Sequence, residues 1–200
     1  MSYFPIFVNL DNLSCLIIGG GKVALRKAKT LLDYGAKIKV VAPNVLEEFK
    51  SLGVAIEYRN FETKDLTNVF LVVTATNDLK LNQQILEICK SKNILCNSST
   101  DNTNNGYIFP SVVKHKDISI GISTSGKSPY ISSKIKSEIS EILPKYDNVI
   151  ELSNEWRKTL IEEVSNSAIR GEIIKHLIDY TLSKETPSKE NIQQLIKKYR

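Results

Sequence analysis

Residues 15–28 read Cys15-Leu-Ile-Ile-Gly-Gly-Gly-Lys-Val-Ala-Leu-Arg-Lys-Ala28. An apolar run is followed by three glycines and then by residues with high helix propensity. Gly19, Gly21 and Ala24 fill the G-x-G-x-x-G/A pattern of a dinucleotide-binding turn. In that pattern the first glycine permits a tight turn, the second lets the backbone approach a pyrophosphate, and the small third residue lets the helix pack closely on the strand. We therefore predict a strand, a phosphate-binding turn and a helix here.

The residues on either side of this turn predict a βαβ unit. Residues 14–18 have the composition of a buried strand, Gly35 is a suitable helix stop, and residues 38–42 form a second apolar run. The alternative is a glycine turn that only permits close packing. The acidic residue that usually binds the adenosine ribose is missing, because Pro43 and Asn44 follow the second strand. The choice between NAD and NADP is therefore open.

Further apolar runs extend the α/β pattern. We predict a short helix over residues 46–52, a third strand over 54–58, a buried fourth strand over 69–74 and a fifth strand over 94–97. The fourth strand ends in Ala75-Thr-Asn-Asp78, at the edge where open α/β sheets bind ligands. Its asparagine and aspartate are equally suited to cap the next helix.

Three segments contribute candidate cofactor-binding residues: the glycine turn, the residues after the second strand and the end of the fourth strand. N–H groups at the start of the first helix point at an anion, with the positive end of the helix dipole behind them, so a pyrophosphate is the expected ligand of the turn. The candidates are Gly19, Gly20, Gly21, Lys22, Val23, Ala24, Pro43, Asn44, Thr74, Ala75, Thr76 and Asn77.

The chain leaves the Rossmann pattern after the fifth strand. Residues 98–106 are polar and form either a surface loop or part of the ligand crevice, with Asp101 as their carboxylate. The alternating run 118–123 predicts a half-buried, antiparallel strand. A second turn, Thr124-Ser-Gly-Lys-Ser-Pro129, precedes a helix that Ser128 can cap with proline at its first position. Its lysine is a candidate contact for an anion.

The two ends of the chain differ in character. Residues 3–10 are apolar and interrupted by Pro5, which suits an edge strand or an arm packed on the sheet. Residues beyond Pro144 are predicted to be helical, with Thr186 and Pro187 opening the last helix. The predicted fold class is thus α/β: a Rossmann-type parallel sheet, then a small α+β region, then a helical C-terminal region.

The composition and the cysteine spacing favour a folded protein without membrane helices or a metal site. A hydrophobic content of 42% suffices for a core, and no apolar run reaches the ~20 residues of a membrane helix. The N-terminus lacks the pattern of a signal peptide, and the three cysteines have no CxxC spacing, so we expect a cytoplasmic protein without a metal site, and with no membrane partner. His115 and His176 are expected to be structural or solvated.

The net charge of +5 includes a lysine-rich segment that can be interpreted in two ways. Five lysines and one acid, Asp117, lie between residues 105 and 137, and these form either a solvated surface or a site for an acidic small molecule. A nucleic acid partner is discounted because the sequence carries no recognition motif.

Several short motifs occur in order along the chain. They are Phe4-Pro-Ile-Phe-Val-Asn-Leu10, the glycine turn, Val41-Ala-Pro43, Thr74-Ala-Thr-Asn77, Phe109-Pro-Ser111 and Ile122-Ser-Thr-Ser-Gly-Lys-Ser-Pro129. Together they resemble the precorrin-2 dehydrogenase family, which includes the N-terminal part of multifunctional siroheme synthases. The resemblance covers about residues 3–143, and the helical C-terminal part matches only in general character.

This resemblance implies NAD-dependent oxidation of precorrin-2, an acidic tetrapyrrole, to sirohydrochlorin on the route to siroheme. Some members of the family also insert ferrous iron into the product. It implies a homodimer as well, so we expect a Rossmann NAD-binding domain in residues 1–110, a dimerisation region in 111–145 and a helical domain in 146–200. Candidate substrate-binding residues lie in the second turn: Ser123, Thr124, Ser125, Lys127 and Ser128.

The family's general acid/base is an aspartate after the fifth strand, commonly the first of a pair. Counted back from Phe109 and Pro110, that first position is Thr100 here and the second is Asp101. Both are candidate catalytic residues, and Asp101 takes the role if the loop shifts by one residue. The alternative function, from another class, is a non-catalytic NAD(H)-sensing module that dimerises through its helical tail.

Overall fold

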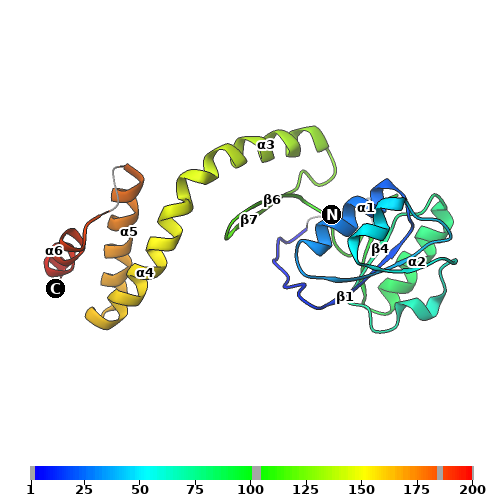
Figure 1. Ribbon diagram of the computed structural model, residues 1–200, viewed down its shortest axis with the longest axis horizontal. Coiled ribbons are helices and arrows are strands. Elements are labelled where there is room, and N and C mark those ends of the chain that lie inside the picture. Colours follow the sequence, from blue (N-terminus) through cyan, green and yellow to red (C-terminus); the bar gives the residue numbers. More distant parts are fainter. Residues whose placement is uncertain (1–2, 101–104, 184–186, 200) are drawn as a thin grey trace. The chain divides into compact units, whose positions relative to one another are not determined.

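The computed structural model describes residues 3–100, 105–183 and 187–199. The chain divides into two compact units, residues 1–110 and residues 111–200 (Figure 1). The elements of the first unit are β1 (Ser14–Ile18), α1 (Lys22–Leu32), β2 (Lys37–Val41), the 3-10 helix η1 (Glu47–Leu52), β3 (Ala55–Glu57), the 3-10 helix η2 (Thr63–Leu66), β4 (Leu71–Thr74), α2 (Leu79–Ser91) and β5 (Leu95–Ser98).

The first unit contains a five-stranded sheet in the order β3-β2-β1-β4-β5, and its neighbouring strands are parallel. One face packs against α1, where Cys15, Ile17 and Val73 meet Ala24 and Ala28. The other face packs against α2, where Leu16, Ile18 and Val72 meet Ile85 and Leu86. Helices on both faces explain why the central strands are apolar at successive positions.

The predicted elements of this unit are present, with small differences in their ends. The helix predicted over residues 46–52 is the 3-10 helix η1, which ends at Gly53 in the left-handed conformation (φ 67°). The third strand is shorter than predicted and spans Ala55–Glu57. Described residues 3–10 form no strand, and Phe4 and Phe7 are 85% and 81% exposed, so this segment is an arm with exposed aromatic side chains.

The chain returns along β5 after the polar segment 98–106. Ser98 itself belongs to β5, and the buried Asn105 side chain accepts from its N–H and donates to its carbonyl oxygen. The N–H of Gly106 donates to the carbonyl oxygen of Cys96 at 2.9 Å. Tyr107 and Phe109 then pack into the core on the α1 side. These contacts protect the edge of the sheet at β5.

The second unit begins with the antiparallel strands β6 (Ser111–His115) and β7 (Ile118–Ile122), as the alternating pattern predicts. The helix α3 (Pro129–Ile142) packs on this hairpin through Ile135 and Ile139. Its cap is the predicted one, because Ser128 Oγ accepts from the N–H of Ile131 at 3.3 Å and Pro129 opens the helix.

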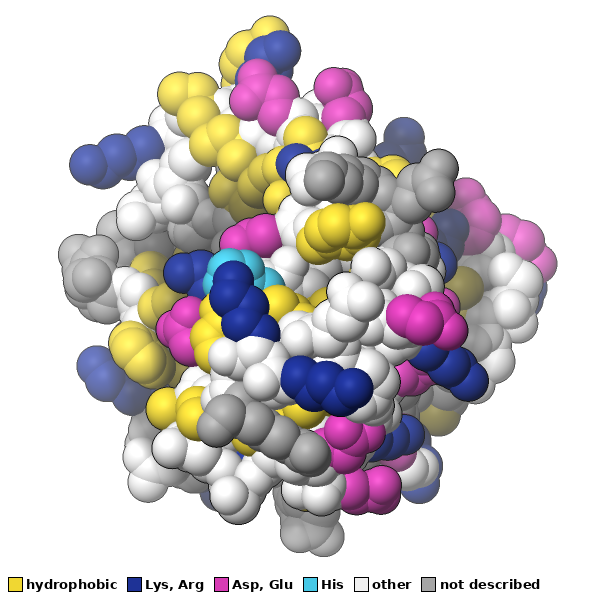
Figure 2. Space-filling model, turned by 90° about the vertical axis from the view of Figure 1, so that its left-hand side faces the viewer, with side chains coloured by type: hydrophobic (Ala, Val, Ile, Leu, Met, Phe, Trp, Pro, Cys, Tyr) yellow, Lys and Arg dark blue, Asp and Glu magenta, His cyan; other side chains and the backbone are white. Residues whose placement is uncertain are grey.

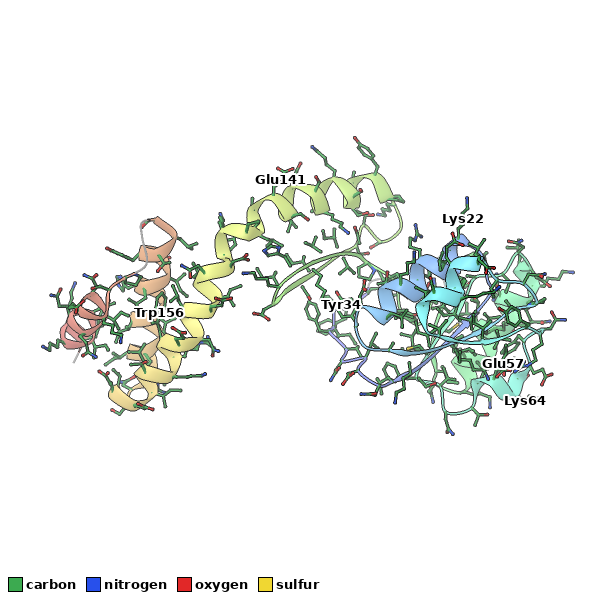
Figure 3. All side chains as sticks on the ribbon, viewed as in Figure 1. Lys22, Tyr34, Glu57, Lys64, Glu141 and Trp156 are labelled. Carbon is green, nitrogen blue, oxygen red and sulfur yellow. The ribbon has the colours of Figure 1, made fainter. Side chains whose placement is uncertain are left out.

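The remainder is helical, as predicted. It comprises the 3-10 helix η3 (Leu143–Tyr146), α4 (Asp147–Glu163), α5 (Ser167–Ser183) and α6 (Lys189–Tyr199). The last three share a core around Trp156, which Figure 3 labels, and Leu160. The predicted start of the last helix is wrong in one respect: Ser188 Oγ accepts from the N–H of Asn191, so Ser188 caps α6 and Pro187 precedes it. Thr186 lies outside the described residues.

Candidate functional site

The register of the sheet brings the ends of four strands to one edge. Ile18 is level with Val41 on one side and with Thr74 on the other, and Thr74 is level with Ser98. The residues after β2, the glycine turn, the residues after β4 and the residues after β5 therefore follow one another in this order along the carboxyl edge, where open α/β sheets bind ligands. The candidate cofactor residues are brought together as predicted by their positions at strand ends.

Close contacts with neighbouring backbone atoms require glycine at two of the three positions of the turn. Gly19 has φ +118°, and a Cβ there would lie 2.3 Å from the carbonyl oxygen of Ala75. A Cβ on Gly20 would lie 2.1 Å from the carbonyl oxygen of Asn44. The turn is held by hydrogen bonds from Gly19 N to Val41 O (3.1 Å) and from Leu46 N to Gly20 O (2.9 Å). The glycines thus place the turn tightly against the ends of both neighbouring strands.

Gly21 is different, because it faces open space. Its φ of −87° is accessible to any residue, and none of the described residues has an atom within 4 Å of the Cβ that a side chain would add. Packing inside the described protein therefore gives no reason for a glycine here. The absent side chain leaves the backbone open to a close ligand, which fits the role of the second glycine in a dinucleotide turn.

The start of α1 is electropositive. Gly21 occupies the N-cap position, so the first N–H groups of the helix have no intrahelical partner and receive no side-chain cap within the described chain. The first turn contains no acid, and Lys22, which Figure 3 labels, is exposed. Ala24 is buried against the sheet, as the small third residue of the pattern requires. The arrangement suits a pyrophosphate group.

The end of β2 lacks an acid, as the sequence indicates. Pro43 and Asn44 are exposed there, and the first carboxylates beyond them belong to Glu47 and Glu48 of η1. A ribose bound at this edge would meet an amide side chain in place of the usual carboxylate.

The end of β4 carries a buried hydroxyl group with an unused hydrogen-bonding capacity. Thr74 is fully buried, and its Oγ1 has no hydrogen-bond partner among the described residues. Buried polar atoms are nearly always hydrogen-bonded, so an unpartnered one at a strand end is compatible with a ligand atom or a water at this position. Asn77 is exposed, and Asp78 caps α2 by accepting from the N–H of Leu81 at 3.0 Å.

The structure describes one of the two catalytic candidates, Thr100. Thr100 is exposed, and its Oγ1 accepts from Asn82 Nδ2 (3.3 Å) and lies 3.1 Å from Ser98 Oγ. Asp101 lies outside the described residues. Among the described partners of Thr100, an amide and a serine hydroxyl, there is no group that would take its proton at neutral pH.

The five candidate substrate residues lie together in the turn before α3. Ser125 and Gly126 adopt left-handed conformations (φ 53° and 77°), and Thr124 Oγ1 accepts from the N–H of Ser128 at 3.2 Å. Lys127 is exposed. Other lysines of this region have ion-pair partners: Lys116 contacts Asp147 at 3.1 Å, and Lys134 contacts Glu138.

Sequence reasoning missed several buried polar side chains of the first unit, among them Lys27 and Asn82. Lys27 lies on the inner face of α1, donates to Asn97 Oδ1 and sits 4.5 Å from the centre of the Phe109 ring. Burial, with a smaller contribution from Arg26, lowers its pKa to about 8. Its position three residues after Ala24, on the helix face that packs on the sheet, is the signal that could have revealed it. Asn82 likewise occupies the inner face of α2 and is fully buried.

The described residues contain neither a metal-binding cluster nor a membrane-spanning helix. Within the described residues no group of three or more His, Cys, Asp or Glu side chains is arranged to hold a metal ion. No described helix is long and apolar enough to cross a membrane. Figure 2 views the molecule from the side of the C-terminal helices, and there Lys and Arg side chains are interspersed with Asp and Glu.

Comparison with known proteins identifies the first unit. A family model described as "Putative NAD(P)-binding" matches residues 6–111, just over half of the 200 residues. The chain belongs to this NAD(P)-binding family. The match spans the glycine turn and all five parallel strands, and it ends beside the boundary between the two compact units.

Relatives of this family member include siroheme synthases. That of Tolumonas auensis is 34% identical over 173 residues, which is 85% of this chain and 37% of the relative. That of Buchnera aphidicola is 36% identical over 171 residues, or 83% of this chain and 36% of the relative. The chain therefore spans little more than a third of the length of these curated relatives.

A solved structure, "SirC, precorrin-2 dehydrogenase", is similar over 98% of both chains, with a TM-score of 0.73 and 25% sequence identity. The similarity includes the helical C-terminal part, which the sequence motifs do not reach. The expected resemblance to precorrin-2 dehydrogenases and siroheme synthases is thus confirmed, as is the predicted fold class.

Proposed function

We propose that this chain is an NAD-dependent precorrin-2 dehydrogenase, which oxidises precorrin-2 to sirohydrochlorin in siroheme biosynthesis. The observation that carries the proposal is the similarity to SirC, precorrin-2 dehydrogenase, over nearly the whole of both chains. The siroheme synthase relatives support the same pathway, and the NAD(P)-binding family supports the cofactor.

The residues of the carboxyl edge fit a dinucleotide. The backbone from Gly19 to Ala24 would hold the pyrophosphate, because the α1 amides converge there and Gly21 leaves the approach open. Residues 74–77 would hold the nicotinamide half, where the exposed Asn77 side chain is available to donate or accept. When bound, NAD accepts a hydride from the tetrapyrrole, and the protein contributes orientation of the two reactants.

Oxidation of the macrocycle also releases a proton, and we assign its acceptance to Asp101. A carboxylate is a competent general base at neutral pH, whereas the hydroxyl of Thr100 is not. Thr100 precedes Asp101 directly, and its own hydrogen bonds to Asn82 and Ser98 hold the residue before the proposed base in place.

The substrate is an acidic tetrapyrrole, and the second turn supplies hydroxyl groups and a lysine to bind carboxylates. In this proposal Ser123, Thr124, Ser125, Lys127 and Ser128 bind the substrate. We also propose a cytoplasmic homodimer with residues 111–145 at the interface. The exposure of apolar side chains on α3, among them Tyr130, Ile131 and Ile142, supports an interface there.

An anaerobic incubation of the protein with precorrin-2 and NAD tests the proposal. We expect NADH absorbance to appear in step with sirohydrochlorin absorbance, and neither to appear without the protein. NAD binding without any NADH formation would contradict the dehydrogenase and favour the NAD(H)-sensing module. A parallel incubation with ferrous iron added after the oxidation asks separately whether the chain inserts the metal.

A further inference from the structure

Both the oxygen and the nitrogen of the buried Asn82 carboxamide form hydrogen bonds. Its Oδ1 accepts from Thr76 Oγ1 at 2.8 Å and from the Thr76 N–H at 3.4 Å. Its Nδ2 donates to the Thr76 carbonyl oxygen at 3.0 Å and to Thr100 Oγ1 at 3.3 Å. The backbone of Thr76 fixes which end is which, because a reversed amide would set donor against donor and acceptor against acceptor.

These contacts join the ends of two neighbouring strands. Thr76 follows β4, whereas Thr100 follows β5, and the last register pair of the two strands is Thr74 with Ser98. Beyond that pair, Ser99 donates from its N–H and from its Oγ to the Thr74 carbonyl oxygen, at 2.9 and 3.0 Å. Asn82 continues this connection past the sheet, at the point where residue 101 follows.

The folding of α2 gives no other reason for asparagine at this position. Asp78 already caps the helix, and the neighbouring inward residues Ile85, Leu86 and Cys89 are apolar. Asparagine has lower helix propensity than leucine, and a buried amide is unfavourable unless it is fully hydrogen-bonded. Asn82 therefore stabilises the residues that follow β4 and β5, through Thr76 and Thr100, and not the helix in which it lies.

We propose that Asn82 is a positioning residue of the dehydrogenase, which holds residues 98–100 against the end of β4 and thereby fixes the residue that directly precedes the proposed base, Asp101. This inference rests on the proposed function. The hydrogen bonds of Asn82 within the described residues go to Thr76 and Thr100 and not to the glycine turn that would hold the pyrophosphate, so its loss should lower kcat more than it raises the Kd for NADH.

Asn82→Asp is the sharpest variant, because it keeps the shape and replaces the donating Nδ2 with an oxygen. We expect at least a tenfold fall in kcat for precorrin-2 oxidation at pH 8, with the Kd for NADH, measured by fluorescence titration, within threefold of wild type. A protonated carboxyl can donate again, so the ratio of variant to wild-type kcat should rise as the pH falls. Gln84→Glu, which makes the same change of charge at an exposed position of α2, is the matched control and should behave as wild type.

Thr100→Val guards against misfolding of the buried variant, because Thr100 is exposed and loses only a hydroxyl group. It should lower kcat in the same sense without the recovery at low pH. Hydrogen exchange supplies a readout apart from activity: amides of residues 75–78 and 98–100 should exchange faster in Asn82→Asp than in wild type, and those of β1 and β2 should not.

If the wild-type protein is active, either of two outcomes would overturn the inference. One is wild-type kcat in both Asn82→Asp and Thr100→Val; the other is a loss of kcat matched by an equal rise in the Kd for NADH. An inactive wild-type protein would instead overturn the proposed function and the positioning role with it. In that case unchanged exchange at residues 98–100 of Asn82→Asp would further show that Asn82 does not hold these residues.

Discussion

The ammonium group of Lys27 donates a hydrogen bond to Oδ1 of Asn97, and both side chains are buried on the α1 side of the sheet. Asn97 Nδ2 donates in turn to the carbonyl oxygen of Tyr107 at 3.0 Å. The Phe109 ring covers the ammonium group. A single lysine thus connects the helix of the glycine turn, the fifth strand and the segment that returns along it.

The buried lysine should make folding stability depend on pH. Its pKa falls from 10.5 to about 8 in the folded protein, so the charged form disfavours folding below pH 8 and stability rises between pH 8 and 10.5, where only the unfolded chain keeps the proton. The rise should reach at most about 3 kcal/mol. Burial also raises the pKa of Cys15 to about 11 and the pKa of Tyr107 above its usual range, and these two groups lower stability as the pH rises above 9. The contribution of Lys27 is therefore the difference in the free energy of unfolding in urea between wild type and Lys27→Met, which should grow from pH 8 to 10.5, whereas the difference between wild type and Lys29→Met, an exposed control, should stay constant. A constant difference between wild type and Lys27→Met would contradict the assignment.

Gly21→Val should impair cofactor binding, whereas Gly19→Val should impair folding stability. Gly21 has an ordinary φ and open space, so valine there should cost less than about 1 kcal/mol of stability and should abolish NADH binding by blocking the pyrophosphate. Gly19 has φ +118°, and a Cβ added there would clash with the Ala75 carbonyl group, so its variant should unfold at a much lower temperature. Thermal unfolding and NADH titration together check this. Wild-type affinity for NADH in Gly21→Val would place the cofactor elsewhere.

Asn44→Asp should favour NAD over NADP. A carboxylate after β2 can accept from the ribose hydroxyl groups of NAD and repels the 2′-phosphate of NADP. We expect the ratio of the Kd for NADPH to the Kd for NADH to rise about tenfold, equivalent to about 1.4 kcal/mol. Gln84→Glu should leave the ratio unchanged, which separates a local effect from one of net charge. An unchanged ratio in Asn44→Asp would mean that the ribose does not reach this residue.

Asp65 should be the main acid-sensitive group of the first unit. Two hydrogen bonds from Arg59, at 2.8 and 2.6 Å, are the largest cause that lowers its pKa from 3.8 to about 2, and the N–H of Glu62 also donates to it. Glu57, labelled in Figure 3, shares the same arginine. Because the folded-state pKa is depressed, this stabilisation is present above pH 4 and is lost as the pH falls from 4 to 2.

Asp65→Asn therefore should lower the free energy of unfolding at pH 7 by about 2 kcal/mol and flatten its pH dependence between 4 and 2. Asp179→Asn, at an exposed position of α5, is the control. If the wild-type and Asp65→Asn curves remain parallel down to pH 2, the Arg59 contact does not stabilise the carboxylate.

Lys127→Ala should weaken substrate binding more than NAD binding. Lys127 is exposed beside the start of α3 and is free to meet a carboxylate, and loss of one such contact should raise the KM for precorrin-2 by about tenfold. Lys134→Ala is the comparison, because Lys134 already pairs with Glu138. Equal losses of affinity for precorrin-2 and NADH in Lys127→Ala would argue against a substrate site in this turn.

Local patterns were sufficient to predict the parts of the site made from backbone. Glycine spacing, apolar runs and the Ser128–Pro129 cap depend on neighbours within a few residues, so the turn at Gly19, the parallel strands and the start of α3 follow from the sequence alone. The same reasoning could not separate a packing glycine from a ligand glycine, because that distinction at Gly21 rests on what surrounds the missing Cβ.

The buried polar contacts depended on the tertiary structure. Asn82 and Thr100 are 18 positions apart, and Lys27 and Asn97 are 70 positions apart. Asparagine and lysine are ordinary surface residues of helices, and their burial becomes favourable only when folding brings a distant partner within hydrogen-bonding distance. The sequence therefore determined the strands and the phosphate-binding turn, whereas the folded sheet decided which side chains hold the ends of β4 and β5 in place.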